Sequence, residues 1–282
     1  MTKRKNFSSN TSKETIKGFG EEWTKFDQSN LPELERENLF NSYFSIFPWK
    51  ELPKDSIGFD AGCGTGRWAL LVAPRVGKLH CIDPSSAIEV AKKNLSKLDN
   101  CYFHRSPVDS MDIEDKTMDF GYSLGVLHHV PDTQQGINDC VKKLKPGAPF
   151  LLYLYYALEN RPLWYRGAWR LSDFLRNLIS RLPFSLRYLV SQFLALVIYW
   201  PLSRFSLFLE KLSIDVSGFP LSAYSSKSFY TMRTDSLDRF GTKLEKRFSA
   251  EQIKEMMILA GLTNISFRPS APYWCALGYK KG

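Results

Sequence analysis

Cysteine is scarce in this sequence and is not arranged for cross-linking. Among 282 residues there are five cysteines, namely Cys63, Cys81, Cys101, Cys140 and Cys275. No two of them form a Cys-x-x-Cys pair, and an odd number in a chain of this length argues against a disulfide framework. We therefore expect the protein to work in a reducing compartment, the cytoplasm.

The sequence also lacks internal repeats, low-complexity segments and an apolar stretch near its start. Residues 1–15 are basic and polar with no apolar run behind them, so we expect neither a secretory signal nor a membrane anchor there. With 44% hydrophobic residues, the chain can bury one large core or two modest ones. The composition thus favours a globular protein of enzyme size.

Positive charge is present in excess and is unevenly distributed. The formal net charge is +9, which suits nucleic acid, an anionic membrane surface or an anionic substrate without distinguishing them. Between Arg161 and Lys211, eight basic residues stand against two acidic ones, a net +6 of the total. The excess is therefore concentrated in one segment.

Short apolar runs alternate with helical patterns over residues 55–155. The pattern predicts strands at 56–59, 78–82, 102–105, 119–123 and 149–155, with helices at 67–72, 85–98 and 134–144 between them. A helix at 250–260 and paired strands at 264–267 and 273–279 come after about 90 intervening residues. Such alternation is typical of a parallel sheet that is covered by helices on both faces.

A glycine-rich turn comes after the first predicted strand in the segment DAGCGTGR. Gly62, Gly64 and Gly66 let backbone N–H groups approach a ligand at the carboxyl end of the strand. Asp83 ends the second strand, where an acid holds ribose hydroxyls in nucleoside sites. A dinucleotide fingerprint would require a glycine at position 67, where this sequence has Arg67, so an NAD(P)-binding oxidoreductase is disfavoured. A tight turn that binds no ligand is the other alternative.

These segments resemble the class I S-adenosylmethionine-dependent methyltransferases. DAGCGTGR, CIDPS, SPVDSM and MDFGYSLGVLHHVPD occur in the family's order and spacing. The resemblance implies a doubly wound, Rossmann-like sheet of seven strands whose last strand is antiparallel, with S-adenosylmethionine as cofactor. It also implies that the cofactor is bound by Asp60, Ala61, Gly62, Cys63, Gly64, Arg67, Asp83, Pro84, Ser85, Pro107, Val108, Asp109, Ser123 and Leu124. Pro107 stands where the family commonly has an acid, so Asp109 or backbone groups would hold the adenine amino group.

The segment GFGEEWTKFD, residues 18–27, could supply an aromatic cover for the cofactor. A sulfonium cation favours aromatic faces and oxygen atoms around it. Related methyltransferases often close the cleft with an N-terminal helix, which makes Phe19, Trp23 and Phe26 candidates. Core packing of that helix is the alternative interpretation of the same pattern.

Candidate catalytic groups stand after the fourth and fifth predicted strands. His128 and His129 are at the lip of the expected cleft, where a neutral imidazole could accept a proton. His128 is the candidate for a catalytic role, and a structural hydrogen-bonding role for both histidines is the alternative. Tyr156 and Glu159 come after the fifth strand and could orient or deprotonate an acceptor. The candidate acceptor-binding residues are Tyr155, Tyr224, Tyr230 and Arg233, the last three in a segment, 222–241, that suits a loop over the site or plain connecting structure.

Two kinds of methyltransferase are disfavoured by the residues after the fourth strand. In a quinone-biosynthesis group this segment carries acids beside a histidine and can bind a divalent metal, but Gly125 and His128 occupy those positions, so we expect no metal. The NPPY or DPPY signature of enzymes that methylate nucleobases is replaced by SLGV. We therefore expect no nucleic-acid partner.

The insertion before the last helix holds most of the positive charge. Residues 164–182 predict an amphipathic helix with an apolar stripe at Leu171, Phe174, Leu175, Leu178 and Leu182 and a basic stripe at Arg166, Arg170 and Arg181. Residues 188–203 are nearly uncharged but shorter than the roughly 20 residues of a membrane span. The segment 161–211 therefore predicts either a lid that packs on the core or an interfacial contact with an anionic membrane, in which Arg170, Arg176 and Arg181 would meet the lipid.

The chain accordingly divides into four predicted segments. Residues 1–54 form a tail and helical cover, 55–155 the cofactor-binding core, 156–246 the helical insertion, and 247–282 a helix and strand pair that complete the sheet. The predicted function is methyl transfer to a small acceptor, with O-methylation of a lipid-linked or carbohydrate acceptor favoured. An oxidoreductase and an inactive methyltransferase-like binding module are the alternatives, and we expect a cytoplasmic location, peripheral to the inner face of a membrane if the insertion docks there.

Overall fold

The computed structural model describes residues 10–216 and 218–282 and is built on a seven-stranded sheet. Its strands are β1 (Ile57–Ala61), β2 (Lys78–Ile82), β3 (Cys101–His104), β4 (Phe120–Leu124), β5 (Pro149–Tyr153), β6 (Leu262–Phe267) and β7 (Cys275–Lys280). They lie in the order β3-β2-β1-β4-β5-β7-β6, with β1 to β5 parallel and β7 antiparallel to both neighbours. The predicted doubly wound sheet with an antiparallel last strand is confirmed.

The two central strands pack through glycines that face phenylalanines. Gly58 of β1 pairs with Phe120 of β4, and Phe59 pairs with Gly121, so each ring lies over a glycine of the neighbouring strand. A Cβ atom at Gly58 would lie 2.2 Å from the Phe120 ring. Phe59 and Phe120 are fully buried, so the ring has no open space into which to move.

We expect Gly58→Ala to destabilise the fold without touching the site. The added methyl group overpacks a rigid core, which costs about 1–3 kcal/mol of unfolding free energy. Gly167→Ala is the matched control, because position 167 is helical and a Cβ there meets open space. Thermal unfolding should show a lower midpoint for Gly58→Ala alone; equal midpoints for the two variants would contradict this packing.

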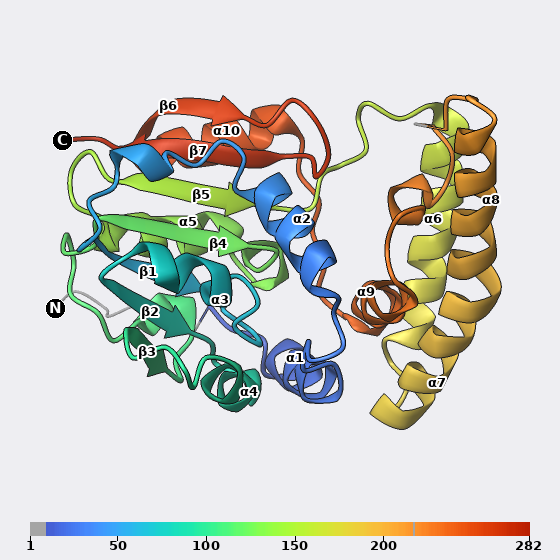
Figure 1. Ribbon diagram of the computed structural model, residues 1–282, viewed down its shortest axis with the longest axis horizontal. Coiled ribbons are helices and arrows are strands. Elements are labelled where there is room, and N and C mark those ends of the chain that lie inside the picture. The colour runs from blue at the N-terminus through green and yellow to red at the C-terminus, as the bar shows by residue number, and fades with distance from the viewer. Residues whose placement is uncertain (1–9, 217) are drawn as a thin grey trace, which may run out of the picture.

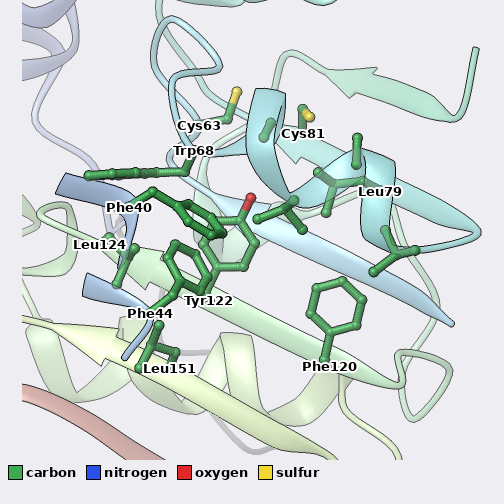
Figure 2. Packing of buried hydrophobic residues seen from close by; sticks show 14 of the residues in the cluster. Phe40, Phe44, Cys63, Trp68, Leu79, Cys81, Phe120, Tyr122, Leu124 and Leu151 are labelled. Carbon is green, nitrogen blue, oxygen red and sulfur yellow. The ribbon is translucent and has the colours of Figure 1, made fainter. Parts of the chain in front are cut away.

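Helices cover both faces of the sheet (Figure 1). On one face, α2 (Glu33–Tyr43) and α3 (Ala69–Val72) contribute to a cluster in which Phe40, Phe44 and Trp68 surround Tyr122 of β4, as Figure 2 shows. On the other face, α5 (Thr133–Lys143) and α10 (Ala250–Leu259) bury Ile137 and Met257. Helix α4 (Ala87–Asn94) lies beside β3 at the edge of the sheet.

The insertion after β5 is helical, as predicted, and lies beyond the carboxyl ends of the strands (Figure 1). It contains α6 (Leu163–Ile179), α7 (Phe184–Leu194), α8 (Trp200–Lys211) and α9 (Phe229–Gly241). The prediction of a loop over 222–241 is wrong for most of its length, because Ser228 accepts a hydrogen bond from Thr231 N and caps α9. Helix α9 packs against α6, α7 and α1 (Lys13–Lys25) and so joins the insertion to the core.

Helices α7 and α8 run together as one helix of 28 residues, Phe184–Lys211. Pro201 lacks the N–H group that would continue the α-helix, and a π-helical turn at 195–199 precedes it and absorbs the change. The helix is therefore longer than the apolar run at 188–203 suggested. By length and composition it could cross a membrane, with a mean hydropathy of 1.4 and 22% of its most apolar window buried.

Candidate active site

The glycine turn after β1 is held open by bonds to β2 and by positive backbone angles. Gly62 and Cys63 donate their N–H groups to the carbonyl of Ile82 at 2.8 and 2.9 Å. Gly62 has φ +86°, and a Cβ there would lie 2.4 Å from Val126, so the position requires glycine. The turn thus presents its backbone at the carboxyl end of the sheet.

Asp83 links this turn to the end of β2. Its Oδ2 accepts from Gly64 N at 3.0 Å, and its Oδ1 accepts from Ser85 N and Oγ at 2.8 and 2.6 Å. Burial raises the pKa of Asp83, and these hydrogen bonds act in the opposite direction. A carboxylate has about four lone-pair directions, so Asp83 retains acceptor capacity for the hydroxyl groups of a ribose.

Asp60 is a buried acid in β1, next to the turn. It is 1% exposed; neither carboxylate oxygen has a hydrogen bond of good geometry among the described residues, although the Tyr122 hydroxyl of β4 is close enough to interact with it. Burial raises the pKa of Asp60 to about 8, and the nearby charge of Asp83 acts in the same direction. Because burial favours the neutral acid and Asp60 does not line the cavity above the turn, its carboxyl group lies beneath the site and does not reach a ligand there.

Helix α1 supplies the aromatic cover. Phe19 and Trp23 both line the cavity above the turn, and Trp23 Nε1 lies 3.6 Å from where a Gly64 Cβ would be. Phe26 lies elsewhere: it is buried and contacts the rings of Tyr188 and Tyr230. The cover therefore comes from two of the three predicted aromatics, and the third packs in the core.

The cavity has a volume of about 430 Å³ and runs from the glycine turn to the helical insertion. The predicted cofactor residues that line it are Phe19, Trp23, Gly62, Cys63, Gly64, Arg67, Asp83, Pro84, Ser85, Pro107, Val108 and Leu124. Asp60, Ala61, Asp109 and Ser123 are not among its lining residues. Ser123 donates to the Ala61 carbonyl at 2.9 Å inside the sheet, and Asp109 accepts from Asn10 N at 2.6 Å.

The structure brings His129, and not His128, to the cavity. His129 Nδ1 lies 2.6 Å from the Leu244 carbonyl, which can only accept, so Nδ1 carries the proton and Nε2 keeps a free lone pair. Nε2 is buried and has no partner among the described residues. His128 is fully buried beside Tyr155, with ring centroids 3.8 Å apart. Burial lowers the pKa of both imidazoles.

Sequence reasoning missed an acid of the insertion that meets this histidine. Asp238 of α9 lines the cavity and accepts a hydrogen bond from the Tyr155 hydroxyl. Burial raises the pKa of Asp238, whereas the positive charge of a protonated His129 would lower it. Helical spacing after the Ser228 cap places Asp235 and Asp238 on one face of α9, a signal that was available in the sequence.

The remaining predicted acceptor residues divide into those in the cavity and those outside it. Tyr155, Tyr156 and Tyr224 line it. Glu159 is exposed instead and accepts from Ala250 N and Trp274 Nε1 at 3.0 and 2.8 Å. Tyr230 accepts from Gln28 N, and Arg233 donates to Gln192, so both join elements of the fold outside the cavity.

Comparison with known proteins agrees with this architecture. Residues 59–152 match the family model described as a methyltransferase domain. In Caenorhabditis elegans, a sterol 4-C-methyltransferase is 29% identical over 134 residues (46% of this chain, 39% of that protein), and phosphoethanolamine N-methyltransferase 2 is 32% identical over 100 residues (34% and 23%). The aligned part thus spans less than half of either relative.

A solved structure shows the same fold at low sequence identity. Phosphoethanolamine N-methyltransferase 2 of Haemonchus contortus, in complex with phosphomonomethylethanolamine and S-adenosylhomocysteine, superposes with a TM-score of 0.50 and 13% identity. The match covers 90% of this chain and 46% of that one. The likeness therefore includes most of this chain, although it concerns only a part of the larger enzyme.

Proposed function

We propose that the chain is a class I methyltransferase and that it transfers the methyl group of S-adenosylmethionine to a hydroxyl group of a small lipid-linked or carbohydrate acceptor. The observation that carries the proposal is a cavity that is lined both by residues of the sheet core and by residues of the helical insertion. We call the part that is lined by the glycine turn, Asp83 and α1 the inner end of the cavity. The part that is lined by Tyr155, His129 and the insertion is called the outer end. Cofactor and acceptor can therefore meet within it.

The residues at the inner end suit the proposed cofactor. Asp83 would bind the ribose hydroxyls, Val108 and Pro107 would flank the adenine, and Trp23 would cover the methionine part over Gly64. When bound, S-adenosylmethionine supplies a methyl carbon that is activated by its positively charged sulfur. Phe19 and Trp23 would exclude water from that carbon and present aromatic faces to the cation.

At the outer end, the chain offers a base for the acceptor. His129 Nε2 would hold the acceptor's hydroxyl group and accept the proton that this group loses on methylation. The Leu244 carbonyl fixes the tautomer, and the nearby Asp238 carboxylate favours the imidazolium that forms. Positioning and proton removal together can supply most of the rate enhancement of a displacement of this kind.

The lining of the outer end suits an acceptor with an apolar part. Tyr43, Tyr153 and Tyr199 present rings to the cavity. The two curated relatives are named for a sterol and for phosphoethanolamine, one apolar and one an amine. Because Asp235 and Asp238 also line the cavity, an amine acceptor is the second candidate, held by the carboxylates as an ammonium.

We expect turnover to stay level as the pH is lowered from 8 toward the ordinary histidine pKa of about 6.5. Burial lowers the pKa of His129, so the base stays neutral and active in this range and becomes protonated only below it. Initial rates of S-adenosylhomocysteine formation at saturating substrates measure this. A decline with its midpoint at or above pH 6.5 would contradict His129 as the base.

Identifying the acceptor requires an assay that makes no assumption about it. The purified protein is incubated with lipid and metabolite extracts and S-adenosylmethionine labelled in its methyl group. We expect one labelled product in the lipid or carbohydrate fraction, stable to conditions that cleave esters. Cofactor binding without transfer to any fraction would favour the inactive binding module, and a labelled amine would favour the second candidate.

A further inference from the structure

The exposed side of the long helix 184–211 is apolar from Leu186 to Phe208. Every well-exposed side chain from Leu186 to Phe208 on the long helix is apolar, including Phe193 and Trp200. On α6, the predicted stripe from Leu171 to Leu182 is likewise exposed. We call these exposed apolar side chains of α6 and the helix 184–211 the outer face. Apolar patches of more than a few hundred Å² on a protein surface mark an interaction site.

The inner side of the same helix is the polar one. Arg187 is buried, forms an ion pair with Glu21 of α1 at 2.9 Å, and donates to the Gly241 carbonyl at 3.0 Å. The Ser191 carbonyl accepts from Ser236 Oγ of α9 at 2.8 Å. A lid that moves in water would bury its apolar side and expose its polar side. This helix does the reverse, which favours contact between its outer face and an apolar surface.

We propose that the outer face docks onto an anionic lipid bilayer, with both helices lying along the surface. Arg166, Arg170 and Arg181 are exposed along one border of the α6 stripe, because successive helical residues turn by about 100°. Exposed Trp164 and Trp200 suit the boundary between headgroups and acyl chains. The cationic border would meet the phosphate groups while the apolar side chains enter the bilayer.

The charges and contacts argue against two other arrangements. A symmetric dimer through this face would bury three arginines against a surface that offers them Glu210 as the single well-exposed acid along Leu163–Lys211 of the described chain. Crossing the bilayer would require the helix to leave α9 and α1, to which Arg187 and Ser191 bind it. Docking along the surface preserves these contacts.

Docking would place the bilayer one helix away from the cavity. Tyr199 is buried and lines the cavity, whereas its neighbours Ile198 and Trp200 are exposed on the outer face. In Figure 1 the long helix forms the outermost layer, with α9 between it and the sheet. An acceptor with an acyl or isoprenoid chain would thus be available beside the site. The docking proposal does not depend on the proposed methyl transfer. If the protein binds vesicles but not S-adenosylmethionine, docking is supported and the proposed methyl transfer is contradicted.

Co-sedimentation of the full-length protein with vesicles tests this. Vesicles of phosphatidylcholine are compared with vesicles that also contain phosphatidylglycerol, at low and high salt. We expect binding only with the anionic lipid, weakened by salt, and reduced at least about tenfold when Arg166, Arg170 and Arg181 are all changed to glutamine. The control changes Lys92, Lys93 and Lys97, which are exposed on and just after α4 and do not belong to the insertion, to glutamine and should bind as wild type.

A second variant tests the apolar part. Leu189→Ser with Phe193→Ser replaces exposed side chains, so thermal unfolding should be unchanged while vesicle binding falls at least about tenfold. If the wild-type protein does not bind anionic vesicles at low salt, the proposal is overturned. The same holds if the triple lysine variant loses as much vesicle binding as the triple arginine variant. A dimer in analytical ultracentrifugation that the same double variant dissolves would overturn it in favour of a second copy.

Discussion

Replacing Asp83 by alanine is expected to weaken the binding of S-adenosylmethionine by about a hundredfold. The carboxylate would accept hydrogen bonds from the ribose hydroxyls, and bonds to a charged group contribute about 1.5–3 kcal/mol each. The substitution also releases Gly64 N and Ser85 N, which shape the turn. Equilibrium dialysis with labelled S-adenosylmethionine measures the change.

Asp83→Asn serves as the matched variant for this experiment. It keeps one acceptor oxygen and the shape of the side chain, so its affinity should fall between those of wild type and Asp83→Ala. Asp83→Ala leaves the amides of Gly64 and Ser85 without this acceptor, so thermal unfolding of both variants is measured to confirm that each is folded at the temperature of the binding experiment. Affinity within a factor of three for Asp83→Ala would contradict the assignment of Asp83 to the cofactor.

The second large effect is expected at the proposed base. His129→Gln should lower kcat by about 10²- to 10⁴-fold while cofactor affinity changes only a few fold, because proton removal matters in the transition state and not in cofactor binding. Initial rates with the identified acceptor at saturating cofactor measure kcat, and dialysis measures affinity.

His128→Gln is the control for this variant. Both histidines are buried and adjacent, but only His129 lines the cavity. If the loss arises from disturbed packing, the two variants should lose turnover together. A larger loss for His128→Gln than for His129→Gln would remove His129 from the mechanism and favour His128, the residue that the sequence alone indicated.

The sheet was predictable because its signals are local. Each parallel strand is a short apolar run between helical patterns. Because these strands are buried on both faces, their sequences are apolar at almost every position and are easy to recognise. Asp83 and the glycines were likewise identified by their positions at strand ends. The choice between His128 and His129 was not predictable, since it depends on how the 3₁₀ turn at 127–129 rotates against Leu244, more than 100 residues away.

The insertion was harder to predict because tertiary contacts decide its elements. Residues 222–241 contain many turn formers, yet Met232, Leu237 and Phe240 are buried and stabilise α9 against its neighbours. Residues 188–203 were expected to be shorter than a membrane span, but the π-helical turn before Pro201 lets the helix continue to Lys211. Arg176 was expected to meet lipid and is buried instead, donating to the Thr242 carbonyl at 2.9 Å.

The central claim is that the cavity is a site for S-adenosylmethionine, and calorimetric titration of the wild-type protein tests it most directly. S-adenosylhomocysteine and NAD are titrated separately into the same preparation. The glycine turn, Asp83 and the aromatic cover predict micromolar binding of S-adenosylhomocysteine and no comparable heat from NAD. Tighter binding of NAD than of S-adenosylhomocysteine would contradict the account and support an oxidoreductase.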